Sequence, residues 1–273
     1  MNGKLYVVGT PIGNLEDLSP RAVRILSEVD FIAAEDTRMT LKLLNHFDLK
    51  NELVSYFEHN KEKKEDYIVR RLLKGETCAV VTDAGMPAIS DPGEQLVYAA
   101  YQSGIPVECV PGPVAFASAL SVSGMPSGRF CFEGFLSVNK ISRMEHLANL
   151  KNETRTMIFY EAPHKLLKTL KDMSECFGAE REIAVVKELT KIHETVFLFT
   201  FEKAIEYFEE NPPKGEYVLI VKGKQEEIEE YTLEDAVKIA KELIEKGNSS
   251  SMAAKSAAQI TGIKKGDIYK ELI

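Results

Sequence analysis

The first 110 residues alternate short apolar runs with amphipathic segments, and this alternation limits the folds that the chain can adopt. The apolar runs predict strands at residues 5–8, 31–34, 53–56, 78–82 and 107–110. The amphipathic segments predict helices between them, at residues 21–28, 40–47, 61–74 and 94–103. Strands that are apolar on both faces are typical of a parallel sheet covered by helices on each side. We therefore predict an α/β fold built on a parallel or mostly parallel sheet.

A second α/β unit follows a stretch rich in serine, glycine and proline at residues 121–130. Its apolar runs predict strands at residues 156–160, 183–186, 195–199 and 217–221. Its helical patterns lie at about residues 140–151, 164–177 and 202–210. Because more strands follow one another directly here, we expect a mixed sheet. The predicted domains are an N-terminal α/β domain, 1–120, a second α/β domain, 121–224, and a tail, 225–273.

The tail is helical in pattern and uneven in charge. Residues 225–246 carry eight acidic side chains and three lysines, whereas residues 247–273 carry four lysines and two acidic side chains. An alanine-rich helix at about 252–259, a turn at Thr261 and Gly262, and a final short helix resemble a helix-turn-helix. A small helical bundle without any nucleic-acid role explains the same pattern equally well, so both interpretations stay open.

The composition is typical of a globular protein from a reducing compartment. The 273 residues carry a formal net charge of −8, which argues against binding nucleic acid by bulk electrostatics. No apolar run approaches about 18 residues, so we expect no transmembrane helix, and the N-terminus has no secretory pattern. The cysteines show neither a zinc-binding nor a disulfide pattern; they are Cys78, Cys109, Cys131 and Cys176. We therefore expect a cytoplasmic protein with reduced thiols.

Three glycine-bearing loops follow predicted strands of the first domain, at residues 9–14, 82–93 and 110–115. The carboxyl ends of parallel strands meet at one edge of a sheet, which is where open α/β sheets bind ligands. The first of them is neither a GxGxxG dinucleotide fingerprint nor a phosphate-binding loop. Together the three loops predict a single ligand crevice.

Several polar residues near strand ends are candidates for chemistry. Asp83 is suited to accept hydrogen bonds from a ribose or to lie near a cationic ligand, whereas Asp91, ahead of Pro92, is typical of an Asx-turn or a helix cap. Glu35, Asp36 and Arg38 form either a structural ion-pair network or a substrate-facing cluster.

The second domain offers a different set of candidates. Lys187 and Glu188 are a possible acid–base pair, and His193 is a possible proton carrier, although a lone histidine more often has a structural role. No HExxH or closely spaced His/Cys set predicts a metal site, and no GxSxG predicts a serine hydrolase.

Eight segments in this order resemble the tetrapyrrole methylase superfamily, the class III S-adenosylmethionine-dependent methyltransferases. The segments are LYVVGTPIGNLEDLSPRA (5–22), AAEDTR (33–38), VVTDAGMPAISDPG (80–93), VPGPVA (110–115), FEGFL (132–136), FYEAPHKL (159–166), KELTKIHE (187–194) and GEYVLIV (215–221). They are most similar to the branch that methylates the ribose of small-subunit ribosomal RNA, and the tail resembles the C-terminal module of that branch. The resemblance implies two α/β domains with the cofactor in the cleft between them, and a homodimer.

The resemblance also implies which residues bind S-adenosylmethionine, largely through the backbone. They are Ile12, Gly13, Asp83, Ala84, Gly85, Met86, Ile89, Val114, Ala115, Tyr160 and Leu189. The chain departs from the usual pattern where Met86 replaces threonine, Val114 replaces serine and Ser137 replaces proline. The first two changes each remove a side-chain hydroxyl, and backbone recognition is expected to survive them.

The branch is similar to enzymes that methylate the ribose 2′-hydroxyl of a cytidine in the decoding region. A ribose hydroxyl is a weak acid, so a nearby group must take or offset its proton. The candidates for this role, in order, are Glu188, Lys187, Glu35 and His193. The candidates for contacts with RNA phosphates are Arg38, Lys140, Arg143 and Lys165.

The implied partner is small-subunit ribosomal RNA or the assembled small subunit. Docking on a folded particle needs only local basic patches. The net charge of −8 therefore predicts poor binding to naked RNA and does not argue against the particle as a partner. One alternative keeps the fold and the cofactor but takes a tetrapyrrole such as a precorrin as substrate. A second alternative is a non-catalytic ribosome-assembly factor that retains the fold.

Overall fold

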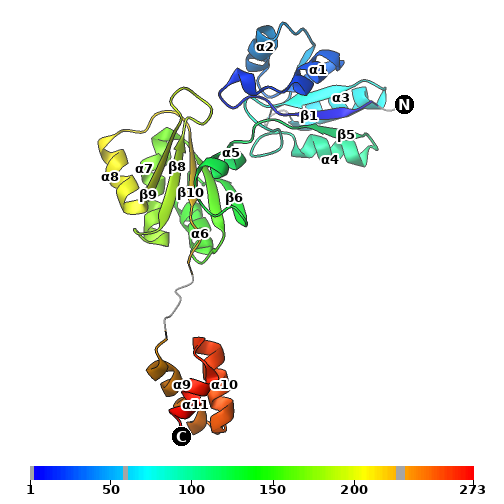
Figure 1. Ribbon diagram of the computed structural model, residues 1–273. Helices are drawn as coiled ribbons and strands as arrows, with labels where there is room; N and C mark the ends of the chain where they lie inside the picture. Colours follow the sequence, from blue (N-terminus) through cyan, green and yellow to red (C-terminus); the bar gives the residue numbers. More distant parts are fainter. Residues whose placement is uncertain (1–2, 58–60, 226–230) are drawn as a thin grey trace. The chain divides into compact units, whose positions relative to one another are not determined.

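The computed structural model describes residues 3–57, 61–225 and 231–273, which form two compact units, Met1–Lys224 and Gln225–Ile273. The first unit contains two five-stranded sheets with their helices, and the second unit contains helices only (Figure 1). No helix among the described residues combines the length and the apolarity needed to cross a bilayer.

The first sheet is parallel throughout, as predicted. Its strand order is β3-β2-β4-β1-β5. The strands are β1 (Leu5–Val8), β2 (Phe31–Ala34), β3 (Leu53–Ser55), β4 (Cys78–Val81) and β5 (Val107–Val110). The apolar side chains of the strands enter two core clusters, one on each face of the sheet. This two-sided burial explains why the strands are apolar along their whole length.

Four helices cover this sheet. The helices α1 (Pro20–Glu28) and α2 (Thr37–His46) bury Ile25 and Leu44 in the cluster on one face. The helices α3 (Lys61–Leu73) and α4 (Glu94–Gln102) bury Leu72 and Leu96 in the cluster on the other face. Ser19 begins α1 as its N-cap, because its hydroxyl accepts a hydrogen bond from Ala22 N at 3.1 Å.

The second sheet is mixed, as predicted, with the order β6-β7-β10-β8-β9. Its strands are β6 (Phe130–Phe135), β7 (Thr156–Glu161), β8 (Glu182–Lys187), β9 (Thr195–Thr200) and β10 (Tyr217–Val221). Only the β6–β7 pair is parallel. One face packs against α6 (Lys140–Leu150), α7 (Pro163–Phe177) and α8 (Phe201–Glu210), which contribute to one core cluster.

The opposite face of the second sheet packs against α5 (Ala115–Val122). Ala119 and Leu120 of this helix are buried with Ile158 and Val218 of the sheet. By its packing, α5 therefore belongs with the second sheet. It begins at Ala115, a few residues before the predicted boundary at residue 120.

The second unit is a bundle of α9 (Leu233–Glu245), α10 (Ser250–Thr261) and α11 (Lys265–Lys270). Its small core consists of alanines together with Ile268. Gly262 ends α10 in the left-handed conformation, with φ +73°, at the predicted turn. The predicted order of helices in the tail is confirmed, and residues 226–230, near its start, lie outside the described residues.

Candidate active site

The three glycine-bearing loops meet at one edge of the first sheet, because they follow the adjacent strands β4, β1 and β5. Gly9 N donates a hydrogen bond to Val110 O at 3.1 Å. A Cβ on Gly9 would lie 2.7 Å from the Cα of Gly112, so these two loops touch backbone to backbone. Only glycine fits at such a contact. The three loops therefore form one continuous surface.

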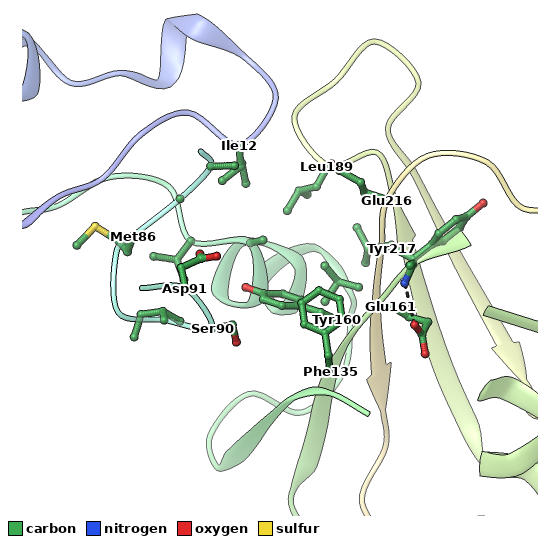
Figure 2. Close-up of a pocket in the computed structure, with 18 of the residues that line it drawn as sticks. Ile12, Met86, Ser90, Asp91, Phe135, Tyr160, Glu161, Leu189, Glu216 and Tyr217 are labelled. Carbon is green, nitrogen blue, oxygen red and sulfur yellow. Dashed lines mark hydrogen bonds between the residues drawn. The ribbon is translucent and has the colours of Figure 1, made fainter. Parts of the chain in front are cut away.

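A cavity of about 570 Å³ lies between this surface and the second sheet. Figure 2 shows Ile12, Met86 and Asp91 on one side of it, with Leu189 and Glu216 on the other. The volume is in the range of pockets that enclose a small organic ligand, roughly 300–1,000 Å³. Apart from Gly13 and Asp83, every residue predicted to contact the cofactor lines this cavity.

Tyr160 of β7 joins the two halves of the site. Its hydroxyl accepts a hydrogen bond from Phe116 N at 3.0 Å, and its ring packs against Phe132 and Phe135 with centroid distances of 4.9 and 5.4 Å. Burial raises the pKa of Tyr160 above its usual value, so the hydroxyl stays protonated near neutral pH. Its role in the structure is to fix the start of α5 against the second sheet.

A charged loop after β8 holds Leu189 at the cavity. Lys191 Nζ lies 2.9 Å from Glu188 Oε1 and 2.7 Å from Glu216 Oε2, and Glu216 N donates to Glu188 Oε1 at 2.9 Å. Gly13 contacts this loop from the first domain, because a Cβ on Gly13 would lie 2.7 Å from Thr190 Oγ1. Gly13 therefore allows the close approach of two loops, and does not line the cavity.

Three carboxylates lie together on the first-domain side. Asp83 N donates to Glu35 Oε2 at 3.3 Å, and burial raises the pKa of both carboxyl groups. Burial, with the negative charges of Glu35 and Asp83, raises the pKa of Asp91 to about 6. Asp83 lines a separate pocket of about 180 Å³ beside Thr10.

The interpretation of Asp91 as a helix cap is wrong. Gly93 is the N-cap of α4, and no side chain makes a hydrogen bond there. Asp91 instead lines the main cavity (Figure 2).

Of the residues predicted to take the proton, Glu35 lies apart from the other three, and none of the four lines the cavity. Glu188 is bound to Lys191, and this hydrogen bond holds the pKa of the Glu188 carboxyl below its usual range. His193 is exposed on the same loop, and Lys187 ends β8. Glu35 lies beside Asp83 in the first domain.

The prediction that Arg143 contacts RNA conflicts with its position. Its side chain is buried, and its Nε donates to Asp172 Oδ2 at 2.7 Å. Its Nη1 donates to the carbonyl oxygens of Ser137 and Val138. All these partners belong to the protein, so Arg143 holds α6 against α7 and the loop before α6.

The other predicted phosphate contacts lie nearer the surface. Arg38 is exposed and forms a bidentate pair with Asp36, at 3.0 and 2.6 Å. Lys140 is exposed at the start of α6, and Lys165 is half-buried in the first turn of α7. These three residues are open to solvent in different degrees.

The cavity also contains residues that we did not predict. The ones with functional side chains are Ser90, Asp91, Phe135, Glu161, His164, Glu216 and Tyr217. All of them fall within the segments that carry the family resemblance, so those segments could have been used to predict them as site residues. Among the described residues, no group of three or more His, Cys, Asp or Glu side chains could hold a metal ion.

Comparison with known families agrees with this architecture. The sequence model of the family Tetrapyrrole (Corrin/Porphyrin) Methylases matches residues 4–205. Two solved structures show the same fold: uroporphyrin-III-C-methyltransferase from Thermus thermophilus, 23% identical with a TM-score of 0.57, and diphthine synthase, 12% identical with a TM-score of 0.63. They cover 81% and 82% of this chain, and the matches span 94% and 91% of theirs. The chain therefore has the fold of the tetrapyrrole methylases and belongs to that family.

Curated relatives narrow this class. Ribosomal RNA small subunit methyltransferase I from Synechocystis sp. is 44% identical over 98% of this chain and 96% of its own length. The protein of that name from Xylella fastidiosa is 46% identical over 98% of both chains. The one from Thermotoga maritima is 47% identical over 223 residues, which are 82% of this chain and all of that protein. The chain belongs to the family of ribosomal RNA small subunit methyltransferase I.

Proposed function

We propose that the chain transfers a methyl group from S-adenosylmethionine to small-subunit ribosomal RNA, and that the main cavity is its cofactor site. The observation that carries the proposal is the convergence of two domains on one cavity, lined by most of the expected cofactor contacts. The identity of 44–47% to relatives named for this activity supports it. A solved structure of the same fold with S-adenyl homocysteine bound, 19% identical with a TM-score of 0.54, supports the choice of cofactor.

The residues of the cavity fit this cofactor. Ile12, Ile89 and Leu189 offer apolar walls for the adenine ring, and the backbone of Ala84 and Gly85 offers polar groups. No lysine or arginine is among the described lining residues, so none of them carries a permanent positive charge that would repel a cation. S-adenosylmethionine supplies a methyl group activated by attachment to a positively charged sulfur.

The acceptor that we propose is the ribose 2′-hydroxyl of a cytidine in the decoding region. In-line transfer requires the hydroxyl oxygen, the methyl carbon and the sulfur to be aligned, so positioning is the main task of the site. Of the residues considered for the proton, Glu35 has the raised pKa that suits a base, whereas the pKa of Glu188 is lowered. Arg38, Lys140 and Lys165 are the proposed phosphate contacts.

The test uses the full chain, labelled S-adenosylmethionine and small subunits from a strain that lacks the activity. We expect label in the small-subunit RNA, on a nucleotide whose 3′ phosphodiester bond resists alkaline hydrolysis because its 2′-hydroxyl is blocked. Uroporphyrinogen III serves as the control acceptor and should remain unlabelled. Unlabelled RNA, under conditions where the cofactor binds, would contradict the RNA substrate. Absence of cofactor binding would favour a non-catalytic assembly factor.

We also infer a homodimer that resides in the cytoplasm. Two large apolar side chains three residues apart, at the start of α6, support a subunit contact: Val138 is 73% exposed and Ile141 72%. The four cysteines are free, which supports a reducing compartment. Light scattering coupled to size-exclusion chromatography measures the mass in solution, and a monomer at micromolar concentration would contradict the dimer.

A further inference from the structure

One carboxylate that lines the cavity has no hydrogen-bond or ion-pair partner among the described residues. Glu161 accepts a hydrogen bond from Ala162 N at 2.8 Å, and Glu216 is paired with Lys191 at 2.7 Å. Asp91 lines the same cavity, and within the described parts of the chain no group donates a hydrogen bond to its side chain. A half-buried carboxylate without a partner is unfavourable in the free protein, so a ligand group is the natural candidate to stabilise it.

The loop that carries Asp91 is built to hold it at the cavity. Ala88 and Ser90 both have left-handed backbones, with φ +68° and φ +63°, and Ala88 N donates to Pro92 O at 3.3 Å. Left-handed non-glycine residues are costly and persist where surrounding structure requires them. Figure 2 shows Asp91 and the Tyr160 ring directed into the same cavity from opposite sides.

The charge of Asp91 depends on its neighbours. Glu35 and Asp83, at the ends of β2 and β4, repel it, and Tyr160, Glu161, His164 and Glu216 lie around the same cavity on the second domain. Of these side chains, only that of His164 can carry a positive charge. The region is therefore negative overall, which favours a cationic ligand over a neutral one of the same shape.

We propose that Asp91 makes the cofactor site selective for charge, so that the site prefers the sulfonium cation to the neutral thioether product. This inference rests on the proposed cofactor site. Transfer of the methyl group leaves the electron pair of the broken carbon–sulfur bond on sulfur, so the product lacks the positive charge. A charge-selective site holds the methyl donor and releases the spent product. Asp91 is a specificity-determining residue in this role, and no proton transfer is assigned to it.

The test compares the affinity for S-adenosylmethionine with that for S-adenosylhomocysteine, measured by calorimetry at pH 7.5 and pH 5.5. In the Asp91→Asn variant we expect affinity for the cation to fall roughly 5- to 30-fold, which corresponds to about 1–2 kcal/mol of lost electrostatic attraction. Affinity for the thioether should change less than about twofold, since its neutral sulfur has no charge–charge attraction to lose. Glu94→Gln is the matched control, because it removes an exposed acid at the start of α4 outside the cavity.

The pH dependence supplies a second readout. Protonation of Asp91 below about pH 6 should weaken cation binding by the wild type, and the Asp91→Asn variant should lose this dependence. A dependence that persists in the variant would assign it to another titratable group around the cavity and overturn the proposal. Equal weakening of both ligands, or no change in either, would also overturn it. Failure of the wild type to bind either ligand would instead reject the proposed cofactor site itself.

Discussion

Thr10 and Gly85 exchange two backbone hydrogen bonds: Thr10 N donates to Gly85 O at 2.9 Å, and Gly85 N donates to Thr10 O at 3.1 Å. This pair joins the loop after β1 to the loop after β4. The cavity wall on this side is therefore held together by backbone groups, whatever side chains stand beside them. Neither hydrogen bond involves the side chain of Met86, which stands where threonine is usual.

Gly9→Ala should disturb this wall. The added Cβ would lie 2.7 Å from Gly112 Cα and 2.6 Å from Met86 Sδ, and the Gly112 backbone cannot move without moving its loop. We expect a loss of about 1–3 kcal/mol in the free energy of unfolding, together with weaker cofactor binding. Gly128→Ala is the control, because nothing lies within 4 Å of its new Cβ. Chemical denaturation and calorimetry measure both effects; equal behaviour of the two variants would refute the close contact.

Arg143→Ala should destabilise the second domain. Removing the arginine leaves Asp172 buried without its partner, which costs about 3–5 kcal/mol in unfolding free energy. Lys140→Ala, three residues earlier and exposed, should change stability by less than about 0.5 kcal/mol. If Lys140 contacts RNA, its variant should instead weaken binding to small subunits.

A double variant, Arg143→Met with Asp172→Leu, tests the RNA role of Arg143 without leaving a buried charge unpaired. It should recover stability and methylate normally, and failure to methylate would restore an RNA role for Arg143.

The layout of the first domain could be predicted from the sequence, because apolar runs and loop glycines report local conformation directly. The convergence of the loops followed from one rule, that parallel strands end at a common edge. The strand β6 was missed because Glu133 and Gly134 interrupt its apolar run, and the structure has a bulge between Phe132 and Gly134. A local pattern cannot show that an irregular strand is completed by pairing with β7.

The roles of individual polar residues depended on distant partners. Arg143 is buried because Asp172, in another helix, neutralises it, and sequence spacing does not reveal that pair. Asp91 precedes Pro92 in a pattern typical of turns, yet the left-handed Ser90 turns it to the cavity. Glu188 is used to hold a loop through Lys191, which is visible only when the loop geometry is known.

Glu188→Gln tests whether that residue is a base or a structural support. The glutamine still offers an oxygen to Lys191 Nζ and Glu216 N, so the loop should persist. We expect kcat to fall less than about tenfold, whereas removal of a general base costs about 10²- to 10⁴-fold. Single-turnover methylation measures the methyl-transfer step, and cofactor titration measures the affinity for the cofactor. A loss above about 100-fold with unchanged cofactor affinity would identify Glu188 as the base.

Asp91→Asn should stabilise the protein in the absence of cofactor, in a pH-dependent manner. The folded pKa of about 6 lies above the reference of 3.8, so ionisation of Asp91 lowers stability as pH rises from about 4 to 6. The variant has no carboxyl group to ionise and so does not lose stability in this way. We expect its free energy of unfolding to exceed that of the wild type by about 1 kcal/mol at pH 7.5 and by little at pH 4. The value at pH 7.5 is reduced from the full effect of the pKa shift because the side chain is only half-buried. Denaturant unfolding at both pH values measures it, and a gain independent of pH would contradict the assignment.

Removal of residues 225–273 should separate cofactor binding from action on RNA. None of the described residues of this unit lines the cavity, and its helices bury a core of their own. We expect cofactor affinity within about twofold of the full chain, with a larger loss of label transferred to small subunits. The Thermotoga maritima relative, matched over its whole length by 223 residues of this chain, indicates that a family member can be this short.

A charge reversal in the full chain distinguishes a nucleic-acid surface from a plain helical bundle. Lys264 and Lys265 are exposed at the start of α11, so Lys264→Glu with Lys265→Glu leaves the alanine core unchanged. If the unit binds RNA, this variant should reduce RNA labelling as the truncation does, and the reduction should be partly relieved at low salt. Full labelling by the double variant, with reduced labelling by the truncated chain, would assign the unit to a protein contact on the particle.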